Sequence, residues 1–202
     1  GKELEKEVIE TLLENEQVVK AYQSCIQKIS VKDRSRKEMY DFLIEKTTLD
    51  IGQINQLIDY LEHKKYINDE QYARSMVQSL QALLQGKQKI IRGLRNKGIA
   101  QELIDKVIQE DNEEEEVANA LALAEKVKPS IRDRSLRSLK QKLTQRLMSQ
   151  GFAFNVIEVV MRSLNFQEEE KGELDNLRKT ALKAKRRQSS KHEGTQLGNA
   201  LH

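Results

Sequence analysis

Two stretches of the sequence carry cationic side chains at helical spacing with almost no carboxylates among them. Residues 86–97 contain five cations and no acid, and residues 128–146 contain seven cations with Asp133 as the single acid. Lysine and arginine bind phosphate and carboxylate groups, and the planar guanidinium does so through two parallel hydrogen bonds. The chemistry predicted here is therefore the binding of an anionic partner, without the making or breaking of covalent bonds.

The candidate partner-binding residues are the following cations of both stretches: Lys87, Lys89, Arg92, Arg95, Lys97, Arg132, Arg134, Arg137, Lys140, Lys142 and Arg146. In the first stretch Lys89, Arg92 and Arg95 are spaced three apart, which places them on one stripe of a helix. An ordinary solvated face would give the same pattern. In the second stretch the cations flank several leucines, and basic stems that merely cover the edges of an apolar stripe would also look like this.

Catalysis finds little support in the residue inventory. His63, His192 and His202 do not form a metal-ligand set with suitable neighbours. Cys25 shares a helical face with Ala21 and Ile29, which favours a buried apolar role over a nucleophile. The sequence has no glycine-rich phosphate loop and no Gly-x-Ser-x-Gly motif. We therefore expect no enzyme, no catalytic residues, no cofactor and no metal.

Composition and charge narrow the class of protein. Charged residues make up 33% of the chain and aromatic residues 4%, which is typical of helices with much solvated surface. The net charge of +3 does not by itself predict a polyanionic partner, and Glu102–Glu116 forms an acidic block between the two basic stretches. One cysteine excludes an internal disulfide. With no apolar run of membrane length and no secretory or transit signal, we expect a cytoplasmic protein that does not contact a membrane.

An internal repeat predicts how the cations are positioned. Aligning Gly98 with Gly151 superimposes apolar residues on apolar residues, and Thr48 takes the place of the glycine in an earlier copy. The matched sets are Ile90, Leu94, Ile99, Ile104, Val107 and Ile108; Leu143, Leu147, Phe152, Ile157, Val160 and Met161; and Tyr40, Ile44, Leu49, Ile54, Leu57 and Ile58. The spacing predicts two short helices, with the glycine ending the first in a left-handed conformation.

A third helix is expected to complete each repeat. Asn68 is a polar cap ahead of Tyr72 and Val77, Glu113–Glu116 lie at a solvated helix start, and Leu174 and Leu177 share a face in the last copy. We predict an all-α, elongated, right- or left-curved array of three tandem three-helix, helix-turn-helix-like repeats. The expected boundaries are 1–33 for N-terminal lead-in helices, 34–84, 85–129 and 130–187 for the repeats, and 188–202 for a disordered tail.

These motifs resemble those of the RecX family. The run Ile67–Ala73 is similar to the acidic, alanine-containing motif of that family, and Gly86-x-x-x-Ile90-x-x-x-Leu94-x-x-Lys97-Gly98-Ile99 is similar to its central signature. Arg34–Glu38 resembles the start of its first repeat, so the ordered motifs span about residues 20 to 165. The resemblance implies a regulator that binds the RecA recombinase filament on DNA and restrains its ATP hydrolysis, strand exchange and coprotease activity in the DNA-damage (SOS) response.

Two hypotheses follow for the partner. In the first, a monomer lies along a RecA filament, touching several protomers, with DNA contacts through the basic faces left open. In the second, the three-helix units act as DNA-binding helix-turn-helix readers. That reading requires a set of side chains at one helix start aimed at base edges, and no such set is identified in the sequence.

Overall fold

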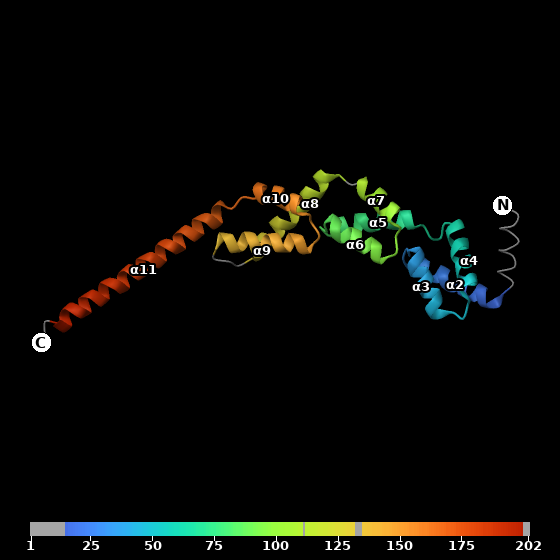
Figure 1. Ribbon diagram of the computed structural model, residues 1–202, viewed down its shortest axis with the longest axis horizontal. Coiled ribbons are helices and arrows are strands. Elements are labelled where there is room, and N and C mark those ends of the chain that lie inside the picture. The colour runs from blue at the N-terminus through green and yellow to red at the C-terminus, as the bar shows by residue number, and fades with distance from the viewer. Residues whose placement is uncertain (1–14, 111, 132–134, 200–202) are drawn as a thin grey trace.

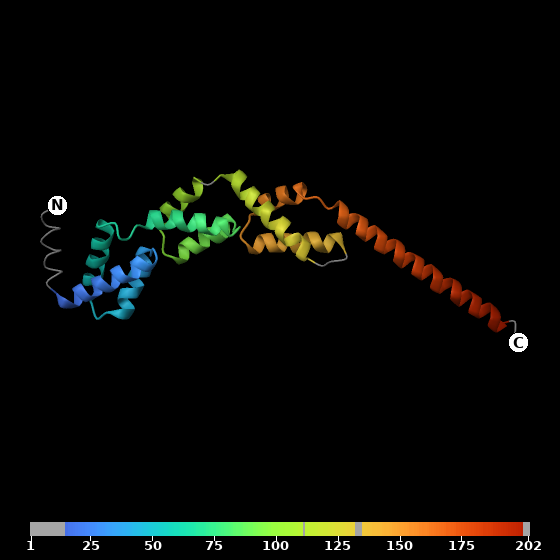
Figure 2. The same cartoon turned by 180° about the vertical axis from the view of Figure 1, so that it is seen from behind.

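The computed structural model describes residues 15–110, 112–131 and 135–199, with side chains as far as residue 187. Within these ranges the chain is all-α, as predicted, with ten α-helices and no strand. Their bounds are α2 Glu16–Val31, α3 Arg36–Lys46, α4 Ile51–His63, α5 Asp69–Ala82, α6 Lys87–Asn96, α7 Gln101–Gln109, α8 Glu113–Val127, α9 Leu136–Ser149, α10 Phe154–Ser163 and α11 Gln167–Asn199, with a 3₁₀ turn η1 at Lys128–Ser130. Figures 1 and 2 show them strung along one long axis.

Three separate apolar clusters hold the helices together. The first joins α2, α3 and α4 through Cys25, Met39 and Leu61, and the second joins α5, α6 and α7 through Val77, Leu94 and Ile104. The third joins α8, α9 and α10. We call these units module 1, module 2 and module 3, and α3, α6 and α9 their middle helices. The repeats expected from the sequence, with boundaries at 34, 85 and 130, begin with α3, α6 and α9. The clusters instead begin with α2, α5 and α8, because the apolar face of α5 packs on α6 and that of α8 packs on α9.

Local sequence determines where several helices begin. Asn68 accepts a hydrogen bond from the backbone N–H of Gln71 at 3.0 Å, which confirms the cap expected ahead of α5. Ser35 and Asp50 form reciprocal capping boxes with Glu38 and Gln53 at the starts of α3 and α4. Each cap satisfies backbone donors that the helix itself leaves unpaired.

The glycine turns are also confirmed. Gly98 and Gly151 have φ values of +74° and +91°, and the N–H groups of Ile99 and Phe152 return to carbonyls in the last turns of α6 and α9. Module 1 differs, because Thr47 ends α3 in an extended conformation with φ −127°. The turn has four residues in all three modules, but the buried Leu43 and Leu49 are six positions apart, whereas the corresponding pairs of modules 2 and 3 are five apart.

This longer spacing corrects the expected register of α3. Tyr40 and Ile44 were aligned with the buried Ile90 and Leu94, but Ile44 is 50% exposed. Met39 and Leu43 are instead fully buried in the first cluster. The alignment of α4 is unaffected, so the error is confined to the helix before the missing left-handed residue.

The C-terminal helix departs from two expectations. Residues 188–202 were expected to be disordered, but α11 continues to Asn199, because a helix that is already formed propagates without a new nucleus. Residues 200–202 lie outside the described residues. Leu174 and Leu177 were expected to pack in the third repeat, and they are exposed because α10, with Leu164 and Phe166, completes that cluster without them.

The lead-in helices are described only in part. Val8, Leu12 and Leu13 lie in residues 1–14, outside the described residues. The second lead-in helix is α2, whose Ala21 and Cys25 are buried in module 1. Among the described helices none is long and apolar enough to cross a membrane.

A repeated contact joins each module to the next. The backbone N–H of the first residue of a middle helix donates to a carboxylate from the first helix of the following module. Arg36 donates to Asp69 at 2.7 Å and Lys87 donates to Glu116 at 3.3 Å. The same geometry occurs a third time, where Leu136 at the start of α9 donates to Glu173 of α11 at 3.3 Å. A carboxylate is favoured at this position because it meets unpaired N–H groups at the positive end of a helix dipole.

A second contact also joins neighbouring modules: the turn that follows the middle helix of one module packs against the start of the middle helix of the module before it. Ser35 Oγ donates to the carbonyl of Lys97 at 2.7 Å, beside the turn at Gly98. At the next junction the N–H groups of Gly86 and Gln88 donate to the carbonyls of Gln150 and Gly151, at 2.9 and 3.0 Å. The C-terminal end of α9 therefore meets the N-terminal start of α6, and the end of α6 meets the start of α3.

Ionic contacts add to the junction between modules 1 and 2. Lys97 Nζ lies 2.5 Å from Glu38 Oε1. Burial alone would raise the pKa of Glu38, but hydrogen bonds from Lys97 and from the Ser35 N–H, with the charges of Lys97 and Arg34, hold the pKa below its usual value. Burial and the neighbouring Glu38 raise the pKa of Tyr72 to about 12.

A substitution at Gly151 tests the junction between modules 2 and 3, because this glycine both ends α9 in a left-handed turn and contacts the start of α6. A Cβ there would lie 2.5 Å from the backbone nitrogen of Lys89, and the left-handed φ disfavours any other residue. We expect Gly151→Ala to lower the free energy of unfolding by about 2–4 kcal/mol. Gly172→Ala is the control, because a Cβ there meets nothing within 4 Å and α11 should gain about 0.5–1 kcal/mol. Urea unfolding of both variants measures the difference; equal stability would contradict the junction.

Candidate functional site

The structure brings the two basic stretches together. Because the end of α9 abuts the start of α6, cations from residues 137–146 and 87–95 follow one another along the array. Five of the candidates are exposed there: Arg92, Arg95, Arg137, Lys142 and Arg146. We call these five residues the basic surface. Figure 1 shows α6 and α9 along the same side of the array.

Four other candidates have contacts inside the chain. Lys87 is 18% exposed and lies 3.6 Å from Glu116, and Lys89 Nζ donates to Gln150 Oε1 at 2.9 Å. Lys97 pairs with Glu38, and Lys140 lies over the ring of Phe166 at 4.6 Å. These side chains contribute to junctions and cluster edges. Arg132 and Arg134 lie outside the described residues.

Glu116 is a structural residue that the sequence reasoning missed. It was placed with Glu113–Glu115 at a solvated helix start, but it is buried and accepts the Lys87 N–H described above. The correction has a plain cause: Glu116 is spaced four and eight residues from Ala120 and Ala124, which are fully buried, so it lies on the inner face of α8. That periodicity was the signal available in the sequence.

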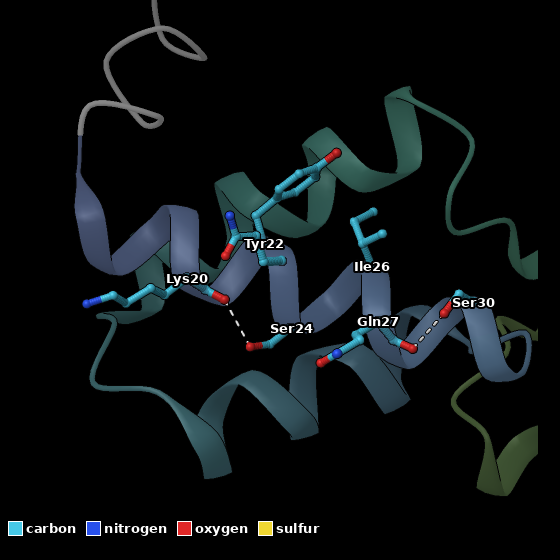
Figure 3. Close-up of a pocket in the computed structure, with 7 residues that line it drawn as sticks. Lys20, Tyr22, Ser24, Ile26, Gln27 and Ser30 are labelled. Atoms are coloured by element: carbon cyan, nitrogen blue, oxygen red, sulfur yellow. Dashed lines mark hydrogen bonds between the residues drawn. The ribbon is translucent and has the colours of Figure 1, made fainter.

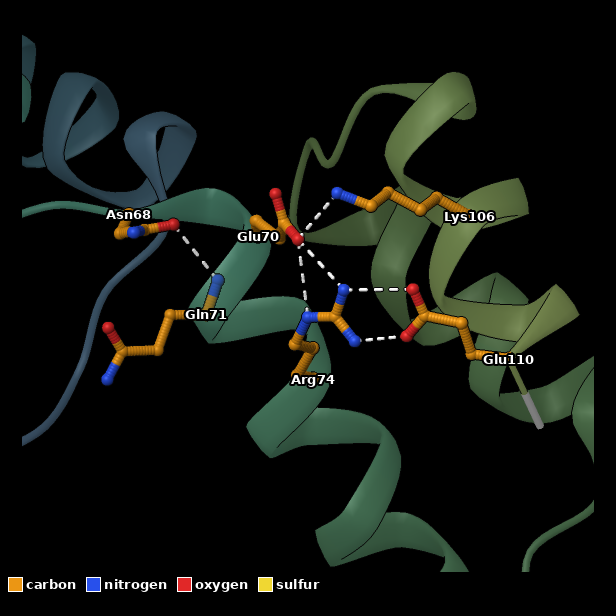
Figure 4. Close-up of polar contacts among 6 residues, drawn as sticks. All are labelled: Asn68, Glu70, Gln71, Arg74, Lys106 and Glu110. Atoms are coloured by element: carbon orange, nitrogen blue, oxygen red, sulfur yellow. Dashed lines mark hydrogen bonds and ion pairs between the residues drawn. The ribbon is translucent and has the colours of Figure 1, made fainter.

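A balanced ion-pair network holds α7 against α5 (Figure 4). Arg74 bonds Glu70 at 2.8 Å and Glu110 at 3.0 Å, and Lys106 bonds Glu70 at 2.7 Å. Hydrogen bonds from Lys106 and Arg74 lower the pKa of Glu70, and the hydrogen bond from Arg74 lowers that of Glu110. Two cations and two acids neutralise one another, so the network offers no excess charge to a partner.

The last helix of each module presents carboxylates to solvent. Asp59 on α4, Asp105 on α7 and Glu158 on α10 are exposed. In a helix-turn-helix unit the helix after the turn enters the major groove of DNA. Asp59 is paired with Arg36 at 2.7 Å and Glu158 with Arg162 at 2.5 Å, so these two acids are balanced by cations within the chain.

A shallow hollow lies along α2 (Figure 3). It has a volume of about 580 Å³, and its lining comes from one helix, including Lys20, Tyr22, Ser24 and Ser30. The hydroxyls of Ser24 and Ser30 donate to backbone carbonyls of their own helix at 2.9 Å, and Lys20 pairs with Glu16. The hollow holds no acid–base pair or activated nucleophile.

The remaining reactive groups have structural surroundings. Cys25 is fully buried, and burial raises the pKa of its thiol to about 12, against a smaller opposing effect of Lys28. His63 lies in the last turn of α4, where a cation suits the negative end of the helix. Among the described residues no three His, Cys, Asp or Glu side chains are arranged to hold a metal ion.

An extended array of helix-turn-helix-like modules with a basic surface defines the class as an all-α interaction protein. The family model described as "RecX, second three-helix domain" matches residues 68–108, and that of "RecX, third three-helix domain" matches 113–161. These ranges fall on modules 2 and 3. The chain belongs to the RecX family, which confirms the resemblance drawn from its motifs.

Similar proteins agree in sequence and in structure. Regulatory protein RecX of Bacillus mycoides is 33% identical over 180 residues, which cover 88% of this chain and 66% of that protein. Its counterpart in Bacillus cytotoxicus is 34% identical over 173 residues, covering 84% and 63%. The chain thus spans just under two thirds of the length of these relatives. A crystal structure of RecX from Lactobacillus salivarius superimposes with a TM-score of 0.66 and 27% identity, covering 72% of this chain and 95% of that one.

The buried thiol gives a simple test of module 1. A protonated, fully buried thiol reacts poorly, because the thiolate is the nucleophile. We expect Cys25 to resist a thiol-specific reagent at pH 8 in the folded protein and to react completely in denaturant. Since the chain has one cysteine, the absorbance change reports this residue alone. Rapid stoichiometric labelling of the folded chain would contradict the packing of α2 on α3 and α4.

Proposed function

We propose that the chain is a non-enzymatic regulator that binds the RecA nucleoprotein filament and restrains its ATP hydrolysis, strand exchange and coprotease activity. Membership of the RecX family supports this, because the relatives bear the name of a regulatory protein and the motifs imply RecA as the target. The cytoplasm, where RecA filaments form on DNA, is the corresponding location.

The observation that carries the proposal is the alignment of α9 and α6. Their junction places the two helices that carry the five exposed cations end to end on an extended array. A helical filament repeats the same groups along its length, so an extended partner can contact several protomers at once. Individually weak contacts then reinforce one another, because each raises the effective concentration of the next. The cations suit carboxylates of RecA or phosphates of the DNA that it coats.

Sequence-specific DNA reading is the weaker alternative. Direct reading of bases requires a set of side chains at one helix start aimed at base edges, and the sequence identifies no such set. Contact of the basic surface with phosphates is compatible with the geometry, and it predicts equal affinity for unrelated duplexes with a steep dependence on salt.

Steady-state ATP hydrolysis by RecA on single-stranded DNA tests the proposal. We expect substoichiometric amounts of the chain to slow hydrolysis. Replacing Arg92, Arg95, Arg137 and Arg146 together by alanine should raise the half-inhibitory concentration about tenfold or more, corresponding to about 1.4 kcal/mol, with a smaller loss at high salt. These four side chains are exposed, so the fold should be preserved.

A control of equal charge keeps the test specific. Replacing the exposed Lys20, Lys46, Lys126 and Arg162 by alanine removes four cations elsewhere and should leave inhibition within about twofold of the unchanged chain. Equal loss in both variants would exclude the basic surface. Unchanged ATP hydrolysis at saturating protein would exclude RecA as the target, whatever the variants do.

A further inference from the structure

Helix α11 is fixed at its start and carries an apolar strip that nothing in the described structure covers. Glu173 accepts the Leu136 N–H, and Lys128 Nζ lies 2.9 Å from Glu169. Beyond these anchors the side chains from Leu174 to residue 187 are exposed, with Leu174 at 56% and Leu177 at 61%. The helix therefore projects from module 3, as Figure 2 shows. A projecting helix without packing is marginal in water, so a partner for its apolar face would stabilise it.

The apolar residues of α11 have the spacing of a helix–helix seam. Leu174, Leu177, Ala181 and Ala184 are separated by three, four and three residues, which places them on one stripe. The alanines allow a second helix to approach closely. A phosphate backbone gains nothing from such a stripe, so the feature points to another helix.

The charges of α11 indicate which helix. Residues 167–177 carry five acids and one cation, and residues 178–187 carry six cations and no acid. A parallel copy of the helix would set like charges against each other. An antiparallel copy sets the acidic half of each helix against the basic half of the other, on both sides of the seam.

We propose that α11 is a self-association surface on which two copies of this chain pair through antiparallel α11 helices. The two-fold symmetric arrangement uses the same patch on both copies and closes after two. Because the anchors of α11 on module 3 remain in place, the two arrays extend in opposite directions from the paired helices. This dimer replaces the monomer expected from the sequence, and it does not depend on RecA being the target.

Sedimentation equilibrium of the full chain measures the association. The unchanged chain should reach twice the mass of the monomer, in a concentration-dependent manner. Leu174→Gln combined with Leu177→Gln should raise the dissociation constant at least about tenfold. Leu182→Gln is the matched control, since Leu182 is 60% exposed but lies off the strip. It should dimerise as the unchanged chain does, and a Cys25 thiol that resists the thiol reagent should show that module 1 is folded in all three chains.

Charge reversal gives a second, independent readout. Variant A carries Arg178→Glu, Lys179→Glu, Lys183→Glu and Arg187→Glu, which leaves two cations against four acids in residues 178–187 and makes both halves of α11 acidic. Variant B carries Glu168→Lys, Glu170→Lys and Asp175→Lys, which makes both halves basic. Neither should self-associate, and an equimolar mixture should form the A–B heterodimer. This recovery on mixing distinguishes charge pairing from loss of the fold.

Three results would overturn the pairing. The first is an unchanged chain that is monomeric at about 100 µM, a concentration at which micromolar association is saturated. The second is a double leucine variant that dimerises as strongly as the unchanged chain. The third is failure of variants A and B to associate when mixed. Weaker binding of variant A to a mixed-sequence duplex, with the unchanged chain monomeric, would assign the basic half of α11 to phosphates instead.

Discussion

A helix start that is completed by the neighbouring module is the contact on which this structure depends. The first N–H groups of a helix have no acceptor within it, and at Arg36, Lys87 and Leu136 the acceptor is a carboxylate supplied from 29 to 37 residues further along the chain. The middle helices therefore become complete only when the next module is in place. Because the donor occupies the same position each time, the modules are added in the same manner along the array.

The junction also explains the positions of the glycines and cations. Gly86 and Gly151 bring two backbones so close that a Cβ on either would lie 2.5 Å from atoms of the other segment. The N–H groups at the start of α6 then reach the carbonyls at the end of α9, where opposite ends of two helix dipoles meet. Lys87 and Lys89 serve this contact, while Arg92 and Arg146 are exposed.

Features encoded by adjacent residues were predictable from the sequence. The cap at Asn68, the left-handed turns at Gly98 and Gly151 and the buried Cys25 each follow from a few neighbouring side chains. The junctions were not predictable, because a carboxylate such as Asp69 or Glu173 carries no local mark of its distant donor. For the same reason the sequence placed α5 in the module before it.

The candidate site was predictable in composition and only partly in role. Basic stretches identify the helices that bear the cations, but Lys87 and Arg92 cannot be told apart without knowing which faces a junction. The end-to-end meeting of the helices that carry Arg92 and Arg146 was likewise not recognisable from the sequence, since it is a tertiary contact. The extra residue between the buried Leu43 and Leu49 had no marker except Thr48 in place of glycine, and it moved the register of α3 by one residue.

Amide hydrogen exchange measured by NMR tests the junctions most directly. The first amide of a helix normally exchanges fast, and those of Gln101 and Phe154, whose helices begin without a side-chain cap, are internal references. The amides of Arg36, Lys87 and Leu136 should exchange at least about tenfold more slowly than these references, because their carboxylate acceptors must move away first. Exchange of all three at the reference rate would contradict the account.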